Sequence, residues 1–471
     1  MNTKIKFFNT MDRRLEEFSP IHPGEARMYT CGPTVYNFAH IGNFRAYMFE
    51  DLLRRTLKYF GYKVTQVMNF TDVDDKTIRD SQACGMKLDD FTAKYKKAFF
   101  EDLKTLNIEK AEVYPAATEH IKEMIALIET LVQKGYAYQA EDNCVYFSIA
   151  KFPEYGRLAK IDFENQRSGV RIKNDEYAKD SVADFALWKA WDEKDGDVYW
   201  ESPWGKGRPG WHIECSAMAM RYLGKTFDIH TGGIDNMFPH HEDEIAQSEA
   251  ANGCTYVNYW LHCAHLMVEG DKMSKSAGNF YTLRECVAKG YSGRELRWVL
   301  LGAHYRKKLN FTFAACDQAR GTLAKFDELF TRLKEAAAPG NGSEAAEIVG
   351  KAKDAFDNGL ADDLNISEAL AAVFGLQHDV NKLLNADSLS KPGAEKVLEQ
   401  FRKFDEIFGL FEVDAEKSEK IPPEVLEMAE KRQAARAAKD WATADAMRDS
   451  LKELGWVVED SADGFRVKRI D

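Results

Sequence analysis

The chain has 471 residues, of which 45% are hydrophobic and 12% aromatic, and its formal net charge is -12. This length exceeds one ordinary hydrophobic core, so it predicts two to four soluble globular domains. No apolar run reaches the length of a membrane span, and the first ten residues lack the apolar core of a signal peptide, so we expect a cytoplasmic protein with no membrane partner. The acidic charge disfavours nucleic acid as a general partner, although a local basic face can still bind RNA.

The eight cysteines are scattered along the chain, and no two of them form a C-x-x-C pair. In a chain of this size, that spacing favours free thiols or metal ligands over a disulfide framework.

The first structured part of the chain has the pattern of a strand, a helix and a second strand. We expect the strand at 27–32, the helix at 40–60 and the second, largely apolar strand at 62–70. Such a β-α-β unit predicts a doubly wound, Rossmann-like parallel sheet, which binds ligands beyond the carboxyl ends of its strands.

The turn into the predicted helix carries His40, Gly42 and Asn43. Unpaired N–H groups at a helix N-terminus attract anions, and a glycine lets a flat group approach the backbone. By itself this short motif is more often an ordinary strand-to-helix turn with one surface histidine.

Three acidic residues follow the second strand: Asp72, Asp74 and Asp75. Helix capping explains such residues as well as ligand binding does, and the sequence leaves both possibilities open.

Further along, helices are predicted at 88–107 and 116–134, followed by an irregular, strand-like stretch at 140–205. The nucleotide-binding pattern resumes at Gly210, and Pro239 is expected at the start of a helix. Residues 257–268 are predicted to form one further strand region.

After about residue 320 the composition changes to long helices rich in Ala, Leu, Lys and Glu, interrupted by a loop at 337–343. A charged linker at 412–423 precedes two helices and a β-hairpin. The expected domains are 1–118 and 206–265 (two halves of the nucleotide-binding domain), 119–205 (an inserted domain), 266–320 (the region that follows the nucleotide-binding domain), 321–411 (a helical bundle) and 424–471 (a C-terminal domain).

Four residues form a candidate metal site: Cys31, Cys215, His240 and Glu244. His240 and Glu244 are four apart and would share a helix face. Thiolates, imidazole and carboxylate are the ligands that zinc accepts. Spacing alone equally allows buried free cysteines with a surface His/Glu pair, and it does not exclude three competing ligands, His212, His230 and His241.

Two motifs in the correct order, His40-Ile-Gly-Asn43 and Lys272-Met-Ser-Lys-Ser276, resemble the signatures of class I aminoacyl-tRNA synthetases. Asn43 departs from the pattern, because a second histidine usually stands there. Three further stretches resemble cysteinyl-tRNA synthetases in particular: Cys31–Tyr36, Gly210–Met218 and Phe238–Glu244.

The resemblance implies roles for individual residues. It implies zinc binding by Cys31, Cys215, His240 and Glu244, and substrate binding by Thr71, Trp211 and Asp235. It implies ATP binding by His40, Gly42, Asn43, Lys272, Ser274 and Lys275, of which His40, Asn43, Lys272 and Lys275 would be catalytic. Anticodon reading would fall to Arg436, Trp441, Asp445 and Asp460. Some of these residues could instead have a purely structural role. The alternatives are an Asx turn for Asp235, core packing for Trp211, and an amphipathic helix with one buried aromatic for Trp441 and Asp445.

The activity implied is ATP-dependent formation of cysteinyl-adenylate, with Mg²⁺ accompanying ATP, and transfer of cysteine to tRNA(Cys) by a monomer. One zinc ion per chain would select cysteine over serine, because a soft metal prefers a thiolate to a hydroxyl. Two rivals are a ligase that joins cysteine to a small amino sugar and an inactive RNA-binding paralogue. The C-terminal domain favours the tRNA reaction over the first, and intact His40, Lys272 and Lys275 disfavour the second. The final stretch, Gly464-Phe-Arg466, departs from the usual family ending.

Overall fold

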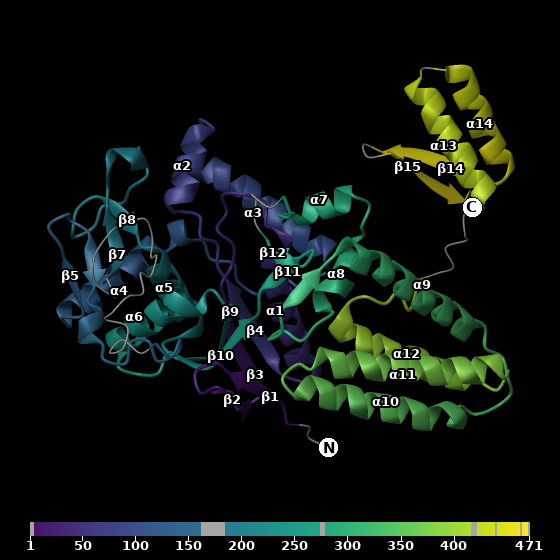
Figure 1. Cartoon of the computed structure of the whole chain (residues 1–471), viewed down its shortest axis with the longest axis horizontal. Helices are drawn as coiled ribbons and strands as arrows, with labels where there is room; N and C mark the ends of the chain where they lie inside the picture. The colour runs from purple at the N-terminus through teal and green to yellow at the C-terminus, as the bar shows by residue number, and fades with distance from the viewer. Residues whose placement is uncertain are drawn as a thin grey trace. The chain divides into compact units, whose positions relative to one another are not determined.

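The computed structural model describes residues 4–161, 184–273, 278–415, 422–438, 440–461 and 464–469. The chain divides into two compact units, Met1–Val413 and Asp414–Asp471. The first combines an α/β body with long helices, and the second is a small helix-and-hairpin unit (Figure 1).

A four-stranded, all-parallel sheet with the order β10–β9–β3–β4 lies at the centre of the first unit. Its strands are β3 (Glu25–Thr30), β4 (Lys63–Met68), β9 (Phe227–Gly233) and β10 (Val257–Cys263). Residues 227–232 of β9 are all buried, as expected for a parallel strand covered on both faces. The predicted fold class, a doubly wound α/β sheet, is confirmed.

Helices cover both faces of this sheet and form two separate cores. One core includes Phe44 and Leu53 of α1 (Ile41–Tyr59). The other contains Ile213 of α5 (Trp211–Leu223) and Ile245 of α6 (Glu242–Asn252). The helices are held by packing, which positions their N-terminal ends along the carboxyl edge of the sheet.

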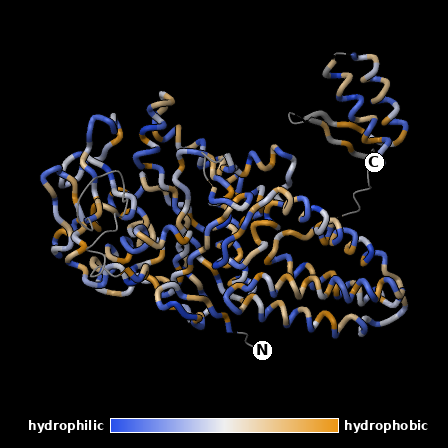
Figure 2. Tube along the Cα trace, viewed as in Figure 1, coloured by the Kyte–Doolittle hydropathy of each residue, from blue (hydrophilic) through white to orange (hydrophobic). Residues whose placement is uncertain are grey.

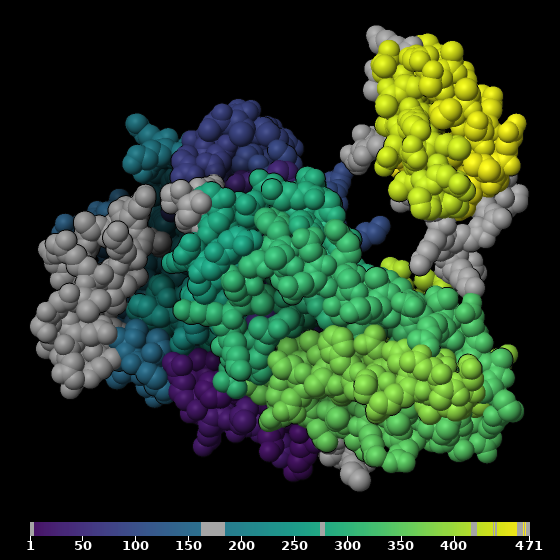
Figure 3. All heavy atoms as spheres, turned by 45° about the vertical axis from the view of Figure 1, so that its right-hand side comes forward, coloured from purple at the N-terminus to yellow at the C-terminus, as the bar shows by residue number. Residues whose placement is uncertain are grey.

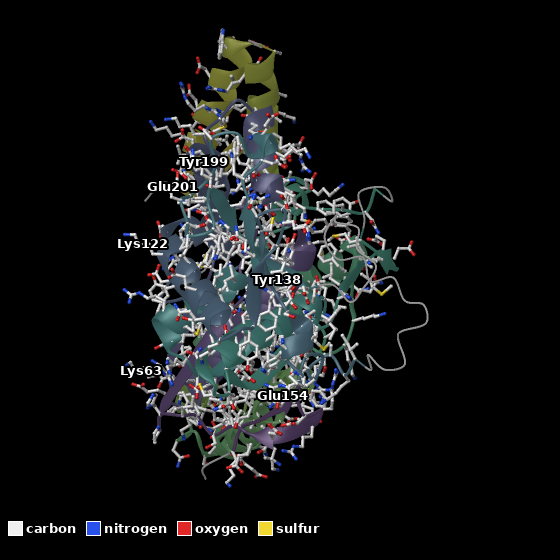
Figure 4. The ribbon with its side chains drawn as sticks, turned by 90° about the vertical axis from the view of Figure 1, so that its left-hand side faces the viewer. Lys63, Lys122, Tyr138, Glu154, Tyr199 and Glu201 are labelled. Carbon is white, nitrogen blue, oxygen red and sulfur yellow. The ribbon has the colours of Figure 1, made fainter. Side chains whose placement is uncertain are left out.

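The described part of the segment after β4 contains three α-helices and a second sheet. The helices are α2 (Asp75–Ala83), α3 (Leu88–Thr105) and α4 (Ile121–Gln133), and the antiparallel sheet is β5 (Ala137–Gln139), β6 (Val145–Phe147), β7 (Phe185–Ala190) and β8 (Gly207–Pro209). Short 3-10 turns lie at Ala117–Glu119, Ile149–Lys151 and Glu193–Asp195. The predicted helix at 116–134 therefore begins later, at Ile121. Figure 4 labels two exposed tyrosines of this segment, Tyr138 and Tyr199.

A small three-stranded sheet follows β10 and carries the lysine motif. It consists of β11 (Leu266–Val268), β12 (Asp271–Lys272) and β13 (Leu309–Phe311), with α7 (Leu283–Ala288) and α8 (Gly293–Leu301) between them in sequence. The strand region predicted at 257–268 is present, divided into β10 and β11, because the chain leaves the central sheet at Ala264, whose N–H donates to Tyr305 O at 2.8 Å.

Four long helices complete the first unit: α9 (Phe313–Glu335), α10 (Ser343–Ala361), α11 (Ile366–Asn385) and α12 (Lys391–Phe408). They lie side by side as one continuous surface in Figure 3, and their apolar and polar residues alternate in Figure 2. Near the N-terminus of the chain, β1 (Lys6–Asn9) and β2 (Arg14–Glu17) form an antiparallel hairpin.

A fully buried arginine, Arg297 of α8, joins this bundle to the sheet layer. Its guanidinium lies 2.6 Å from the Asp51 carboxylate of α1 and donates to Leu106 O at 2.9 Å, just beyond α3. It also donates to Phe408 O, the last residue of α12. One buried charge thus binds α1 and the C-terminal ends of α3 and α12, where helix carbonyls lack internal partners.

The second unit contains α13 (Pro423–Ala437), α14 (Trp441–Glu453) and a hairpin of β14 (Trp456–Ser461) and β15 (Gly464–Arg469). Its small core includes Val425, Leu451 and Trp456. The predicted two helices followed by a hairpin are present. In the part of the chain that the structure describes, no helix has the length and apolar character that crossing a membrane requires.

A buried glutamate on α1 is expected to make the stability of the protein depend on pH. Glu50 of α1 is 1% exposed and accepts a hydrogen bond from Thr231 Oγ1 at 3.0 Å, and burial raises its pKa from 4.5 to about 8. Between these values the unfolded chain binds fewer protons than the folded chain, so stability falls as pH rises. From about pH 5.5 to about pH 7 we expect wild type to lose about 2 kcal/mol of unfolding free energy relative to Glu50→Gln. Urea unfolding at several pH values checks this, with exposed Glu17→Gln as control, and parallel curves for wild type and Glu50→Gln would contradict it.

Candidate active site and metal centre

The N-terminus of α1 is capped by a reciprocal pair of hydrogen bonds. His40 is the N-cap, and its Nδ1 accepts the Asn43 backbone N–H at 3.1 Å, while Asn43 Oδ1 accepts the His40 backbone N–H at 3.1 Å. Because Nδ1 accepts, the neutral imidazole carries its proton on Nε2, which makes Nε2 a hydrogen-bond donor. Asn43 therefore has a structural role as a capping residue, which the resemblance to the signature motif did not reveal.

Gly42 lies where the two signature motifs meet. A Cβ at this position would lie 2.9 Å from Met273 Cε and 3.0 Å from His40 Nδ1, so a side chain would displace one of them. Lys272 is exposed at the end of β12, and Asn279 donates to its carbonyl at 3.3 Å. The fold therefore brings His40, Gly42 and Lys272 into one region, while Ser274 and Lys275 lie outside the described residues.

The four predicted metal ligands, which are far apart in the sequence, converge at the carboxyl edge of the sheet. One ligand atom from each of Cys31, Cys215, His240 and Glu244 lies within 4.8 Å of the other three. Cys31 follows β3, Cys215 lies on α5 and Glu244 lies on α6.

Residues 237–241 form a π-type helical turn that continues directly into α6 at Glu242. Phe238 alone is extended there (φ -142°, ψ 131°), so helical backbone begins at Pro239, as the sequence predicted. His240 therefore lies in the turn, yet its Nε2 is 3.1 Å from Glu244 Oε1.

The polar atoms of this cluster fit a bound cation. Glu244 Oε2 accepts hydrogen bonds from His230 and Tyr256 at 3.0 and 3.2 Å. Oε1 is buried and lies 3.1 Å from His240 Nε2, but among the described residues it has no partner with hydrogen-bond geometry. Burial alone would raise the pKa of Glu244, but the charge and hydrogen bond of His230 lower it to about 2. Burial opposes protonation of His240, yet Cys215 and Glu244 raise its pKa to about 10. Two thiols, an imidazole and a carboxylate within 4.8 Å of one another are a donor set that zinc accepts.

A second grouping, Cys31, His230, His241 and Glu244, meets the same distance criterion. Here His241 also contacts a buried group outside the set, since its Nδ1 is 2.8 Å from His262 Nε2. The set with two cysteines offers zinc the softer ligands.

His212, the third competing ligand in the sequence, supports His240. Its Nδ1 is 2.8 Å from His240 Nδ1, and its Nε2 is 3.1 Å from Asp243 Oδ2. Tyr155 in turn hydrogen-bonds to Asp243. The sequence did not predict that His212, Asp243 and Tyr155 support His240. The adjacent histidines at 240 and 241 were the one hint of such a network.

The three predicted substrate residues have different neighbours in the structure. The ring centroids of Trp211 and His240 are 4.3 Å apart, and Trp211 is 39% exposed, so the core-packing alternative for this residue is wrong. Thr71 Oγ1 donates to Glu214 Oε2 at 2.9 Å. Asp235 is exposed beside Gly233, where a Cβ would lie 2.4 Å from Asp235 Oδ1.

Acidic residues after β4 have different roles from one another. Asp74 caps α2 through the Thr77 N–H at 2.7 Å, whereas Asp72 is buried and lies 2.6 Å from Lys96 Nζ. Asp75 pairs with Lys189 at 2.9 Å. Capping thus explains only one of the three.

The predicted anticodon residues lie in the second unit. Trp441 is 58% exposed at the start of α14, so the alternative of one buried aromatic is wrong. Arg436 is exposed on α13, and Asp445 lies 2.9 Å from Arg448 NH1. The Asp460 side chain lies outside the described residues, although its backbone belongs to β14.

A parallel sheet with a histidine-capped helix and a facing lysine motif defines a class I aminoacyl-tRNA synthetase. Residues 17–321 match the family model described as tRNA synthetases class I (C) catalytic domain, residues 355–412 match the DALR domain, and residues 418–467 match the cysteinyl-tRNA ligase anticodon binding domain. In fold, the chain resembles Mycobacterium tuberculosis methionyl-tRNA synthetase bound by methionyl-adenylate, with a TM-score of 0.63, 14% identity, and 82% of this chain and 92% of that chain covered.

Two curated relatives are similar over almost their whole length. The cysteine–tRNA ligase of Protochlamydia amoebophila is 49% identical, covering 99% of this chain and 98% of the relative. That of Brachyspira hyodysenteriae is 49% identical, covering 99% of both chains. The chain belongs to the cysteine–tRNA ligase family, as the sequence motifs predicted.

Proposed function

We propose that the protein is an ATP-dependent cysteine–tRNA ligase, with ATP, L-cysteine and tRNA(Cys) as substrates and Mg²⁺ accompanying ATP. The observation that carries this proposal is the convergence of Cys31, Cys215, His240 and Glu244 at the same sheet edge as the capped entrance to α1. Amino-acid selection and phosphate binding would then take place side by side. The protein is proposed to act as a cytoplasmic monomer, organised in the domain ranges expected from the sequence.

In the first step, a carboxylate oxygen of cysteine attacks the α-phosphorus of ATP, and pyrophosphate leaves. In the second, a ribose hydroxyl of the terminal tRNA adenosine attacks the acyl carbon and AMP leaves. Neither step needs a protein nucleophile, so catalysis rests on positioning and on stabilising the developing phosphate charge. His40 Nε2–H and the first N–H groups of α1 donate to phosphate oxygens, and Lys272 and Lys275 supply positive charge.

The four converging ligands would hold one zinc ion at the base of the cysteine site. When bound, zinc would favour a thiolate over the hydroxyl of serine, because soft sulfur ligands suit this metal better than a hydroxyl oxygen. Trp211 and Thr71 border the amino acid, and the Asp235 carboxylate is proposed to bind its ammonium group.

The test of this function is cysteine-dependent ATP–pyrophosphate exchange, with serine in parallel, followed by charging of a tRNA(Cys) transcript. We expect exchange with cysteine alone and charging of the transcript. Absence of exchange would overturn the adenylation assignment. Transfer of cysteine to an amino sugar instead of tRNA would establish the rival ligase.

Trp441 gives a prediction for the tRNA-binding role of the second unit. Stacking of an unpaired base on an exposed indole contributes about 1–3 kcal/mol per base. We therefore expect Trp441→Ala to lower kcat/KM for tRNA charging by about 10- to 100-fold without changing cysteine-dependent exchange. Leu454→Ala is a matched control, because Leu454 is also exposed in this unit, at 46%. Charging unchanged in Trp441→Ala would remove Trp441 from the tRNA contacts.

A further inference from the structure

The loop that leads into α1 carries a partly exposed phenylalanine surrounded by cations and a second aromatic ring. Phe38 lies edge-on to Tyr95, with ring centroids 5.3 Å apart. Lys94 Nζ lies 5.8 Å and Arg284 Cζ lies 5.1 Å from the centroid of the same ring. We call these four residues, Phe38, Tyr95, Lys94 and Arg284, the rim cluster.

The rim cluster draws its members from three separate elements. Phe38 lies on the loop, Lys94 and Tyr95 lie on α3, and Arg284 lies on α7. Figure 1 shows α3 and α7 next to each other, and Arg284 joins them directly through a 2.7 Å contact with Glu101. The fold therefore builds this arrangement from sequence-distant parts.

The loop holding Phe38 is fixed at the carboxyl edge of the sheet at both of its ends. Val35 N–H donates to Thr71 O at 3.1 Å, beside the proposed amino-acid site, and Ile41 N–H donates to Tyr281 O at 3.0 Å. Phe38 precedes the capping histidine His40 by two residues. The rim cluster thus lies at the entrance to the proposed active site and is not a remote surface feature.

The chemistry of the rim cluster matches an unpaired nucleotide. A phenyl face stacks on a base, and neighbouring cations attract its phosphate. Part of the Arg284 charge is neutralised by Glu101 and by Asp102, whose carboxylate is 3.1 Å away. Lys94 adds a second cation, and Lys76 makes a similar contact with Tyr36 on the same loop, 5.4 Å from its ring centroid.

Resting on the proposed function, we propose that the rim cluster is a stacking platform for the unpaired 3′ end of tRNA as it enters the active site. The transfer step requires that single-stranded end to pass the loop before its terminal ribose reaches the adenylate. The other base available in the reaction, the adenine of ATP, is the less suitable occupant. ATP is proposed to bind where Gly42 meets Met273 of the lysine motif. Phe38 instead faces α3 and α7, so its ring lies on another side of the loop from that site.

The test separates the two steps of the reaction in Phe38→Ala, Phe38→Leu and Phe38→Trp. We expect Phe38→Ala and Phe38→Leu to keep cysteine-dependent exchange within about twofold of wild type and to lower kcat/KM for charging by about 10- to 100-fold. The same loss is expected with a minihelix that carries only the acceptor stem and its 3′ end. Phe38→Trp should charge tRNA about as well as wild type, because it keeps an aromatic face at this position.

Phe8 provides a matched control in the same protein. It is also partly buried beneath a guanidinium, with Arg306 Cζ 4.3 Å from its ring centroid, but it lies on β1, at the opposite end of the unit from α3 and α7 in Figure 1. Phe8→Ala should leave both exchange and charging unchanged.

Four results would overturn the inference. Equal loss of exchange and charging would assign the cluster to ATP, and unchanged charging in Phe38→Ala would leave it a packing contact. Full activity of Phe38→Leu would show that apolar volume suffices, and a loss seen only with full-length tRNA would place the contact away from the acceptor end. Failure of the proposed function is distinguishable, since wild-type protein would then show no cysteine-dependent exchange at all.

Discussion

Cys215→Ala is expected to abolish stoichiometric zinc binding and to lower cysteine-dependent ATP–pyrophosphate exchange by at least about 100-fold. Loss of a residue that only supports a metal ligand typically costs about 10- to 100-fold, and Cys215 is proposed as a ligand itself. Its removal would leave three of the four converging donors. Metal analysis of the purified protein and exchange assays with cysteine and serine measure both effects.

Cys286→Ala is the matched control for this prediction. Cys286 is likewise a fully buried thiol, but it lies on α7, outside the cluster. It should retain one zinc per chain and wild-type exchange. A Cys215→Ala protein that keeps its zinc, or that still discriminates cysteine from serine as wild type does, would show that the metal assignment is wrong.

His40→Asn is expected to fold as stably as wild type and to lose about 100- to 1,000-fold in exchange. Removing one donor that stabilises charge in the transition state has an effect of this size. Asparagine is a good N-cap, so the substitution preserves an acceptor for the Asn43 N–H while it removes the imidazole donor. Thermal unfolding and exchange kinetics measure stability and catalysis separately.

His40→Ala is the companion variant, because it removes both the cap and the donor. It should lose about 1 kcal/mol of stability in addition to the catalytic loss. If His40→Asn retained full exchange, the contribution of His40 would be capping alone, and the phosphate donors would have to be the backbone N–H groups of α1.

The sequence predicted the central β-α-β unit well because its signals are local. The apolar strands flank a helix that ends near Gly61, and the structure places these elements at β3, α1 and β4 within two residues of the expected ends. The break after β10 was missed for the opposite reason. Nothing in residues 257–268 shows that Ala264 pairs with Tyr305, a contact between segments distant in sequence.

The metal cluster could be predicted only through the family resemblance. Periodicity cannot bring Cys31 next to Cys215, because their proximity depends on β3 and α5 meeting at one sheet edge. The helical start at Pro239 could be predicted, since proline is tolerated in the first turn of a helix, whereas the π-type geometry of that turn could not. The role of Asn43 became clear only from the reciprocal hydrogen bonds with His40.

The buried guanidinium of Arg297 has a mechanical consequence. It hydrogen-bonds to the ends of α3 and α12 and to Asp51 of α1, so bending between the sheet layer and the helical bundle would strip partners from a charge that has no access to water. Breaking a buried ion pair of this kind costs about 3–5 kcal/mol. The sheet layer and α9–α12 are therefore expected to move as one rigid body. A displacement of the bundle would then reach α1, the helix that His40 caps.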